Sequence, residues 1–399
     1  MINKEDKRNF IQKRLYTYHF LNDGITFVLP TLMASLFIFF NLNWFQAGLI
    51  FAFNALALVV GQIIVGYYTD KHSEILMKVG LFILALSSFL IIFSVDFISL
   101  LIFAIFSGFA LGFQHSISYS TTSRMFKEDR DVKIGRQGAA GDIGKCTAVF
   151  SSALLIILFL SWQLVLIVWS FVILIIFIVI IYNFRKIKFS DYFIEIDEMS
   201  ENLLSNNQRT TSKSLVALII ISYILYAAAY TMIITNLATY LRVEKTGQVS
   251  EYSGLILGYT ILFGFLGAYI SGIFKNKVGM SYSIIIIGIL MIFVLNLYVH
   301  LDSSDLIITL LFFGIIGFFL YIIYPQLLGA TNNFTHPKKI GLGFGIVLSL
   351  GWFGNFLGAL IGGYFANLYS PNMFFILGSL ILIILIALAI VMKLKYNMK

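Results

Sequence analysis

The sequence predicts an all-α polytopic membrane protein whose twelve transmembrane helices form two pseudo-symmetric six-helix bundles. Three observations lead to this fold class. Of the 399 residues, 59% are apolar and only 12% are charged, whereas an average protein carries about 25% charged residues. Long apolar stretches alternate with short polar connections, and the two halves of the chain share a repeated pattern. A soluble globular domain is therefore excluded.

Twelve apolar stretches are long enough to cross a bilayer, which takes about 20 residues per helix. They cover residues 15–40, 45–67, 75–93, 98–125, 138–159, 164–182, 215–241, 251–274, 282–299, 306–327, 342–364 and 371–392. The corresponding domains are a polar N-terminus (1–14), an N-terminal bundle (15–182), a linker (183–214), a C-terminal bundle (215–392) and a short C-terminus (393–399).

The distribution of basic residues predicts the orientation. The chain has 27 Lys and Arg residues against 19 Asp and Glu, a formal net charge of +8. All of the basic residues except Lys145, Arg242 and Lys245 fall at the chain ends or in connections on one side of the predicted spans. The positive-inside rule places this side, with both termini, in the cytoplasm. We therefore expect a monomer in a lipid bilayer, of a prokaryotic plasma membrane, and no nucleic-acid partner.

An internal repeat relates the two halves. Shifting the chain by 206 residues, the separation of Gly254 from Gly48, aligns the second predicted span with the eighth. The matching pairs are Gly48 with Gly254, Leu49 with Leu255, Ile50 with Ile256, Gly61 with Gly267, Gly66 with Gly272 and Lys71 with Lys277. Two six-span halves in the same orientation are typical of one class of secondary transporters, in which the substrate binds near the membrane midplane between the halves.

The loop after the second span resembles a known motif. Gly66, Asp70 and Lys71 match the start of the loop motif of the major facilitator superfamily, in which Asp and a basic residue follow the Gly by four and five positions; Ser73 and Glu74 replace the Gly and Arg expected beyond. The resemblance implies a gating role for Gly66, Asp70 and Lys71. By the repeat, Gly272 and Lys277 are candidates for the same role.

Two further segments are similar to the fosmidomycin-resistance group of efflux proteins within this superfamily. They are His19 to Asp23 with Pro30 in the first span, and Gly112 to Ser116 in the fourth, where the Pro expected after the His is absent. This similarity implies efflux of an anionic or drug-like compound. The fifth span has glycines as in drug–proton antiporters, at Gly138, Gly141 and Gly144, but lacks the Pro of their motif.

Polar residues inside the N-terminal spans are candidates for substrate and proton binding, because charges in a bilayer are costly and usually functional. They are His19, Asn22 and Asp23 in the first span, Gln114 and His115 in the fourth, and Asp142 and Lys145 in the fifth. A rise of about 1.5 Å per residue puts them at a common depth of about 11–15 Å. We expect them to surround a central cavity, with a carboxylate, Asp23 first, carrying a proton. Alternatively, Asp142 and Lys145 are only a neutralising pair within one helix, and His19 makes a structural hydrogen bond.

The C-terminal half offers aromatic and amide groups at the corresponding places. The candidates are Tyr226, Tyr230 and Asn236 in the seventh span and Tyr321 and Tyr324 in the tenth. A Tyr ring can stack on an apolar part of a ligand while its hydroxyl orients a polar part. The alternative is that these tyrosines only pack or anchor helices at the membrane interface.

These patterns predict a secondary active transporter for a small organic solute, coupled to protons. No Gly-x-x-x-x-Gly-Lys-Ser/Thr loop for a nucleotide occurs. The five histidines lie in different segments, so the sequence shows no metal or nucleophile constellation, and we expect no cofactor, no metal and no enzymatic activity. Lys145 suits an organic anion, although Asp23 and Asp142 could cancel its charge. A proton-coupled uptake symporter for a sugar or carboxylate, and a nontransporting receptor or scaffold, are the alternatives.

Overall fold

The computed structural model describes residues 4–126, 129–185, 187–194, 212–332 and 340–396, and these ranges are helical with short connections and no strand. In the N-terminal half the helices are α1 (Lys4–Phe39), α2 (Trp44–Leu90), η1 (Ile91–Phe93), α3 (Phe97–Leu111), α4 (Phe113–Met125), α5 (Arg130–Phe159), α6 (Trp162–Asn183) and η2 (Phe189–Tyr192). In the C-terminal half they are α8 (Lys213–Ile234), α9 (Leu237–Glu244), α10 (Gly247–Glu251), α11 (Ser253–Val278), α12 (Met280–Leu301), α13 (Leu306–Asn332), α14 (Ile340–Leu368) and α15 (Met373–Tyr396).

The helices account for twelve membrane crossings. Eleven helical segments of the described chain are long and apolar enough to span a membrane, and one of them, Trp44–Phe93, has 50 residues. At about 1.5 Å per residue it is about 75 Å long, more than twice the hydrocarbon thickness of about 30 Å. Its backbone leaves helical geometry at His72 (φ −131°, ψ 25°). The kink at His72 therefore separates the second and third spans.

Three helices differ from their predicted extents. Helix α1 begins at Lys4 rather than at residue 15, so most of the predicted polar N-terminus is helical; there Arg8 Nε donates to the backbone oxygen of Tyr192 at 2.9 Å. The fourth span is divided at Gly112 into α3 and α4, and the seventh near Asn236 into α8 and α9. At Gly112 the chain packs closely on α2: an added Cβ would lie 2.6 Å from the backbone oxygen of Leu58.

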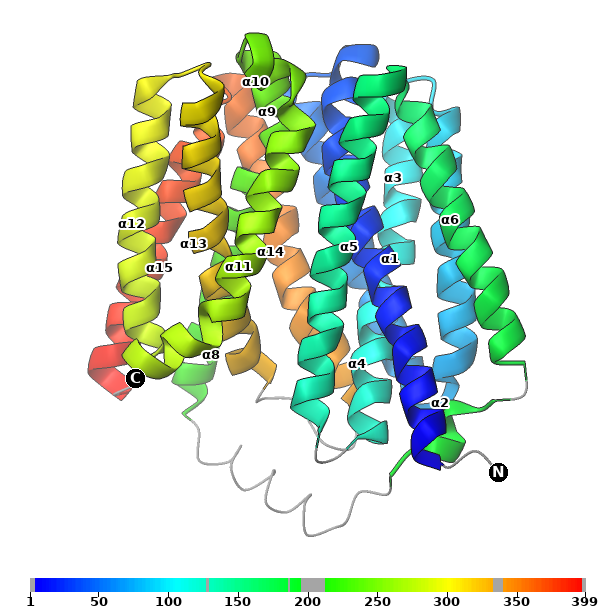
Figure 1. The fold of residues 1–399 in the computed structure, drawn as a ribbon. Helices are drawn as coiled ribbons and strands as arrows, with labels where there is room; N and C mark the ends of the chain where they lie inside the picture. The colour runs from blue at the N-terminus through cyan, green and yellow to red at the C-terminus, as the bar shows by residue number, and fades with distance from the viewer. Residues whose placement is uncertain (1–3, 127–128, 186, 195–211, 333–339, 397–399) are drawn as a thin grey trace.

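The two halves lie side by side, and both chain ends lie at the same face of the molecule, which we call the terminal face; the opposite face is the loop face (Figure 1). The halves meet where α2 packs against α14 and where α5 packs against α11. These helices are the second and eleventh spans and the fifth and eighth. Each pair thus joins a helix to a neighbour in the other half in the way expected for two repeats about a shared axis.

Glycines allow the close approach of α2 and α14 at both ends of this contact. A Cβ added to Gly48, toward the loop face, would lie 2.7 Å from the backbone oxygen of Ala359. One added to Gly66, toward the terminal face, would lie 2.9 Å from the backbone oxygen of Gly341. Small residues are the usual means by which membrane helices pack backbone to backbone.

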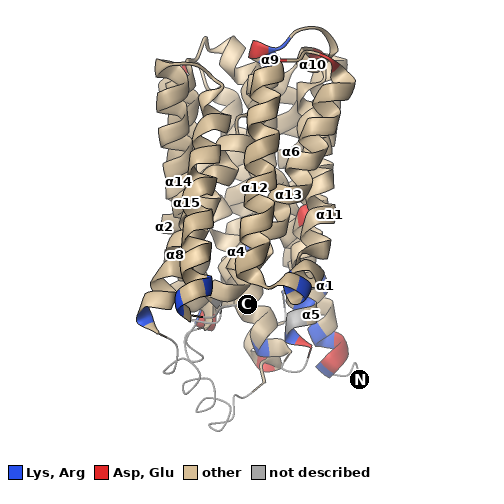
Figure 2. Ribbon diagram, turned by 90° about the vertical axis from the view of Figure 1, so that its left-hand side faces the viewer, with Lys and Arg blue, Asp and Glu red and all other residues tan. Residues whose placement is uncertain are grey.

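Charged residues are concentrated at the ends of the helices. In Figure 2, Lys and Arg gather at the terminal face, while the loop face carries a small charged patch near α9 and α10. The long middle of the bundle is almost free of charge at its surface. The few charges inside the bundle are therefore the exceptions that need an explanation.

Candidate substrate and proton site

Helices α1 and α5 cross in direct backbone contact at the centre of the N-terminal half. A Cβ added to Gly144 would lie 2.1 Å from the backbone oxygen of Phe20, and one added to Gly24 would lie 3.2 Å from the backbone oxygen of Gly144. Glycine at these positions thus allows the two helices to touch. The contact places the polar face of α1 against the charged face of α5.

Lys145 forms ion pairs with two carboxylates across this contact. Its Nζ lies 3.1 Å from Oδ2 of Asp23 and 2.9 Å from Oδ1 of Asp142. The Asp23 side chain is 8% exposed and the side chains of Asp142 and Lys145 are each 19% exposed. The predicted pairing of Asp142 with Lys145 within one helix is present, but Lys145 also bridges to α1. One ammonium is shared by two carboxylates.

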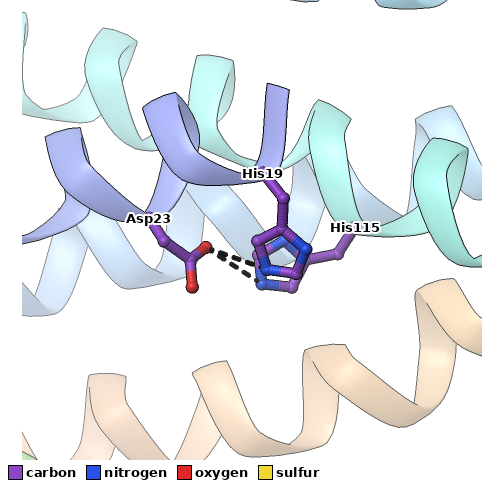
Figure 3. A group of neighbouring side chains, drawn as sticks. All are labelled: His19, Asp23 and His115. Atoms are coloured by element: carbon purple, nitrogen blue, oxygen red, sulfur yellow. Dashed lines mark ion pairs between the residues drawn. The ribbon is translucent and has the colours of Figure 1, made fainter. Parts of the chain in front are cut away.

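Two histidines complete this group, which we call the charge cluster: His19, Asp23, His115, Asp142 and Lys145. The Nε2 atoms of His19 and His115 lie 3.4 Å and 3.7 Å from Oδ1 of Asp23. Figure 3 shows both imidazole rings converging on this carboxylate from α1 and α4. Asp23 therefore faces the histidines with one oxygen and Lys145 with the other.

The C-terminal half presents tyrosines rather than charges. The Tyr230 and Tyr321 hydroxyls lie 2.6 Å apart, and the Tyr223 hydroxyl donates to that of Tyr324 at 3.5 Å. The Tyr226 hydroxyl donates to the backbone oxygen of Leu320. We call these five residues the tyrosine cluster. Tyr230 and Tyr324 are close enough to Lys145 to interact with it electrostatically, so the two clusters face each other between the halves.

The predicted amide residues are buried but lie in different surroundings. The Gln114 side chain donates to the Ser118 hydroxyl at 2.9 Å within α4. Asn22 lies beside Asp23 on α1, and its side-chain oxygen has no hydrogen-bond partner among the described residues. Asn236 lies at the break between α8 and α9, and neither of its side-chain polar atoms is paired within the described part of the chain.

The predicted gating residues Gly66 to Lys71 are not in a loop: they are helical and precede the kink of α2 at His72. Two of them connect the halves at the terminal face. Asp70 Oδ1 lies 2.9 Å from Arg124 NH2 and accepts hydrogen bonds from the Ser120 hydroxyl at 3.0 Å and from the backbone N–H of Gly341 at 3.1 Å. The last bond crosses from α2 to α14. Gly66 packs on α14 one turn earlier. By contrast, Lys71, Gly272 and Lys277 are exposed, and the space around Gly272 is open.

Sequence reasoning missed two residues of these networks. Tyr119 lies against both histidines, with ring centroids 5.7 Å from His19 and 6.0 Å from His115, and it also packs on Phe344 of α14 at 5.5 Å. Its position four residues after His115 puts it on the same helix face, which is a signal the sequence contains. Arg124, the partner of Asp70, has no comparable signal in the sequence, because it is one of many basic residues near the terminal face of the molecule.

One part of the charge cluster has the composition of a metal site. A ligand atom from each of His19, Asp23 and His115 lies within 4.8 Å of the other two. The sequence predicted no metal-binding group because the five histidines lie in different segments. That reason does not hold, since the fold brings His19 and His115 together. No comparable group of three occurs elsewhere in the described ranges.

The sequence matches the model of one protein family, described as the Major Facilitator Superfamily, over residues 15–347. The chain belongs to this superfamily. Among solved structures, the nucleoside transporter NupG is similar with a TM-score of 0.75 at 14% sequence identity, covering 96% of this chain and 99% of that one. A bacterial homolog of the human lysosomal transporter Spinster, in an inward-facing and occupied conformation, has a TM-score of 0.75 at 13% identity and covers 98% of both chains. No curated protein matches the sequence.

As a major facilitator superfamily protein, the chain is an integral membrane transporter and not an enzyme. The structural neighbours confirm the predicted fold of two six-helix bundles. At this level of identity they show the fold alone. The substrate must therefore be inferred from the charge and tyrosine clusters of this chain.

Proposed function

We propose that this protein is a secondary active carrier that couples the movement of a small organic solute to protons by alternating access. The observation that supports this is the pair of ion pairs that Lys145 makes with Asp23 and Asp142 inside the bundle. These side chains lie near the tyrosine cluster, across the contact between the halves. Intramembrane charges are costly and are kept mainly for substrate and ion pathways. The position between the halves is where carriers of this repeat architecture bind substrate.

The sharing of one lysine between two carboxylates provides a way to link solute to proton. When a proton neutralises either carboxylate, Lys145 is left with the other one or becomes free for an anionic group of the solute. Binding of the solute anion at Lys145 conversely leaves a carboxylate without its counter-ion and favours its protonation. By reciprocal linkage, the solute and the proton then change each other's affinity by the same factor.

Once a proton has neutralised one of the two carboxylates, the solute that best suits this site is an organic anion with a ring or another flat apolar part. Lys145 supplies the positive charge, and the tyrosine cluster supplies faces for stacking and hydroxyls for hydrogen bonds. Carboxylates and phosphonates have this chemistry. The similarity of the His19–Asp23 and Gly112–Ser116 segments to efflux proteins favours export, in which solute and proton exchange. The positive linkage described above instead moves solute and proton in the same direction, so the direction is decided by the assay below.

The terminal face is proposed to be cytoplasmic, because it carries most of the Lys and Arg residues. Opening of this face requires separation of α2 from α14. That movement breaks the hydrogen bond from Gly341 to Asp70 and the packing of Gly66 on Gly341. The Asp70 network then acts as a gate that is closed in this structure, and a single chain contains all of its parts.

The test uses proteoliposomes loaded with a pH-sensitive dye and challenged with a panel of carboxylates, phosphonates, nucleosides and sugars. We expect one class to move protons, and Asp23→Asn or Asp142→Asn to abolish gradient-driven flux while solute counterflow persists. Asp305→Asn is the matched control, because this exposed carboxylate only caps α13 through Ile308. Unchanged gradient-driven flux in both cluster variants would refute proton coupling at this site.

The same assay decides between export and uptake. A solute added outside raises the pH of the lumen when it exchanges for protons and lowers it when it enters together with them. The second result would favour the alternative of an uptake symporter for a sugar or carboxylate.

A further inference from the structure

The His19, Asp23 and His115 side chains converge in a way that the transport proposal does not require. Two imidazole Nε2 atoms lie 3.4 Å and 3.7 Å from the same carboxylate oxygen, and the ring centroids are 4.9 Å apart. His19 and Asp23 are one turn apart on α1, and His115 reaches them from α4 (Figure 3). Lys145 alone is enough to pair with the Asp23 carboxylate. The presence of two histidines beside the same carboxylate therefore needs another explanation.

The spacing of these atoms fits the ligand shell of a small metal ion. Zinc binds imidazole nitrogen and carboxylate oxygen at about 2.0–2.2 Å, so neighbouring ligand atoms in a tetrahedral shell are about 3.3–3.6 Å apart. The two His–Asp distances are at this value or just beyond it, and the ligand atoms of all three residues lie within 4.8 Å of one another. Two imidazoles and one carboxylate suit Zn²⁺, Co²⁺ or Ni²⁺ rather than Mg²⁺ or Ca²⁺, which prefer all-oxygen sites.

The charge around the site also favours a cation. Asp23 and Asp142 contribute two negative charges and Lys145 one positive charge, which leaves one negative charge uncompensated when the histidines are neutral. A net charge in a bilayer is expensive unless it is paired. His115 and Lys145 are partly exposed, with side chains 14% and 19% accessible, whereas the Asp23 side chain is 8% exposed.

Lys145 is the group that opposes metal binding. Its ammonium contacts Oδ2 of Asp23, whereas the histidines face Oδ1. A divalent ion at Oδ1 repels the ammonium, but Lys145 has a second partner in Asp142 at 2.9 Å on its own helix. The lysine can therefore withdraw to Asp142 without losing its only counter-ion.

We propose that His19, Asp23 and His115 bind one divalent transition-metal ion of the Zn²⁺ or Co²⁺ type, in competition with Lys145 for Asp23. The binding is of moderate strength, because neither histidine Nδ1 has a hydrogen-bond partner among the described residues. Loss of such outer partners typically weakens a metal site about 10- to 100-fold. This inference goes beyond the proposed transport activity and does not depend on it.

The experiment measures Co²⁺ and Zn²⁺ binding to the full-length protein, purified in detergent without a polyhistidine tag. Titration calorimetry with Zn²⁺ gives the stoichiometry and Kd, and the visible absorption of bound Co²⁺ reports its coordination. We expect one ion per chain. His115→Gln weakens binding at least about tenfold by removing one of three protein ligands, while His300→Gln, a change at an exposed histidine at the end of α12, leaves it unchanged.

The lysine variants separate this site from adventitious histidine binding. Lys145→Met removes the competitor and tightens binding, whereas Asp142→Asn leaves Asp23 as the only partner of Lys145 and weakens it. If Lys145→Met is too unstable to purify, the double variant Lys145→Met/Asp142→Asn, which removes one charge of each sign, is expected to bind more tightly than wild type.

Three results would overturn the proposal: no stoichiometric binding to the wild type, unchanged binding in His115→Gln, or weaker binding when Lys145 is removed from a folded variant. None of these measurements involves transport. A failed metal titration therefore leaves the proton-coupled carrier untouched, and a failed flux assay leaves the metal site untouched.

Discussion

The two halves of this transporter bring opposite chemistry to the same place. The N-terminal half contributes the charge cluster, and the C-terminal half contributes the tyrosine cluster. Equivalent glycine contacts make the difference specific. In the N-terminal half a Cβ added to Gly141 would lie 2.6 Å from Oδ2 of Asp23 and 2.6 Å from Cδ2 of His19. In the C-terminal half a Cβ added to Gly351 would lie 2.5 Å from the Tyr223 hydroxyl, so a tyrosine ring lies where the other half places a charged and an imidazole side chain.

The comparison shows how one architecture can divide recognition between its halves. Buried charges must be paired, so each member of the charge cluster fixes the place of its neighbours and removal of one affects all. Tyrosine hydroxyls are neutral and each can both donate and accept a hydrogen bond. The tyrosine cluster can therefore lose one hydroxyl at modest cost. Substitutions in the two clusters are expected to differ in size and in kind.

The largest effect is expected for Lys145→Met. The change leaves Asp23 and Asp142 buried without their shared counter-ion, and breaking a buried pair in this way typically costs about 3–5 kcal/mol. Because Lys145 is partly exposed, we expect a value near the lower end, together with complete loss of transport. Thermal unfolding in detergent and flux in proteoliposomes measure the two effects.

A neutral version of the cluster separates folding from function. The triple variant Asp23→Asn/Asp142→Asn/Lys145→Met removes all three charges, and we expect its stability to return to near that of the wild type while transport stays lost. If this variant transports at a normal rate, the charges serve helix insertion only.

A smaller loss of stability and transport is expected for a substitution at the contact between α1 and α5, which brings the charge cluster together. Gly144→Ala places a Cβ 2.1 Å from the backbone oxygen of Phe20, and overpacking of this kind costs about 1–3 kcal/mol. The helices must move apart, which lengthens the Asp23–Lys145 contact and slows transport. Gly138→Ala is the control on the same helix: nothing lies within 4 Å of its added Cβ, and we expect a gain of about 0.5–1 kcal/mol. Equal stabilities of the two variants would contradict the close contact.

The tyrosine cluster should give changes in affinity rather than in coupling. Tyr230→Phe removes the hydroxyl that contacts Tyr321 and faces Lys145. Loss of one hydrogen bond of about 1–1.4 kcal/mol corresponds to a rise in KM of about five- to tenfold, with the ratio of solute to protons unchanged. Tyr226→Phe is the control, because its hydroxyl binds the backbone of Leu320 and its loss lowers stability by about 1 kcal/mol without changing KM. A changed stoichiometry in Tyr230→Phe would mean that this half also takes part in coupling.

Much of the fold could be predicted from the sequence, because the bilayer imposes one length and one polarity on every span. The close packing at Gly112 could not, since it depends on contact with another helix. At Gly112 the contact is with Leu58 of α2, a residue far away in the sequence. The kink at His72 lies at the predicted boundary between two spans, where the backbone leaves helical geometry.

For the site, the sequence could indicate which residues share a depth but not which ones touch. A count along each helix puts Asp23, His115 and Lys145 in one layer, and the structure brings them together. The direction in which each side chain points depends on how the helices pack on one another at Gly24 and Gly144. This packing joins two helices and cannot be derived from the sequence of either one. For the same reason the convergence of His19 and His115 on Asp23 was beyond sequence reasoning.

The smallest effect is expected for a carboxylate outside both clusters, at Asp96. This exposed residue caps the N-terminus of α3, where it accepts hydrogen bonds from the Ser99 hydroxyl and backbone N–H at 2.6 Å and 2.8 Å. These bonds, the one from the hydroxyl first, lower the pKa of Asp96 below its ordinary value of 3.8. A lowered pKa in the folded state means that the stabilisation is complete above the ordinary value and is lost as the pH falls below it.

Asp96→Asn keeps a capping side chain but removes the charge. We expect transport to be unchanged and Tm to fall by about 2 °C at most at neutral pH, with the difference from wild type decreasing as the pH falls below 3.8, the ordinary pKa of Asp. Thermal unfolding of both proteins across this pH range measures it. Because Asp96→Asn is the same substitution as Asp23→Asn, the pair isolates the effect of location. A transport defect in Asp96→Asn as large as that in Asp23→Asn would mean that the charge cluster has no special place among the carboxylates of this protein.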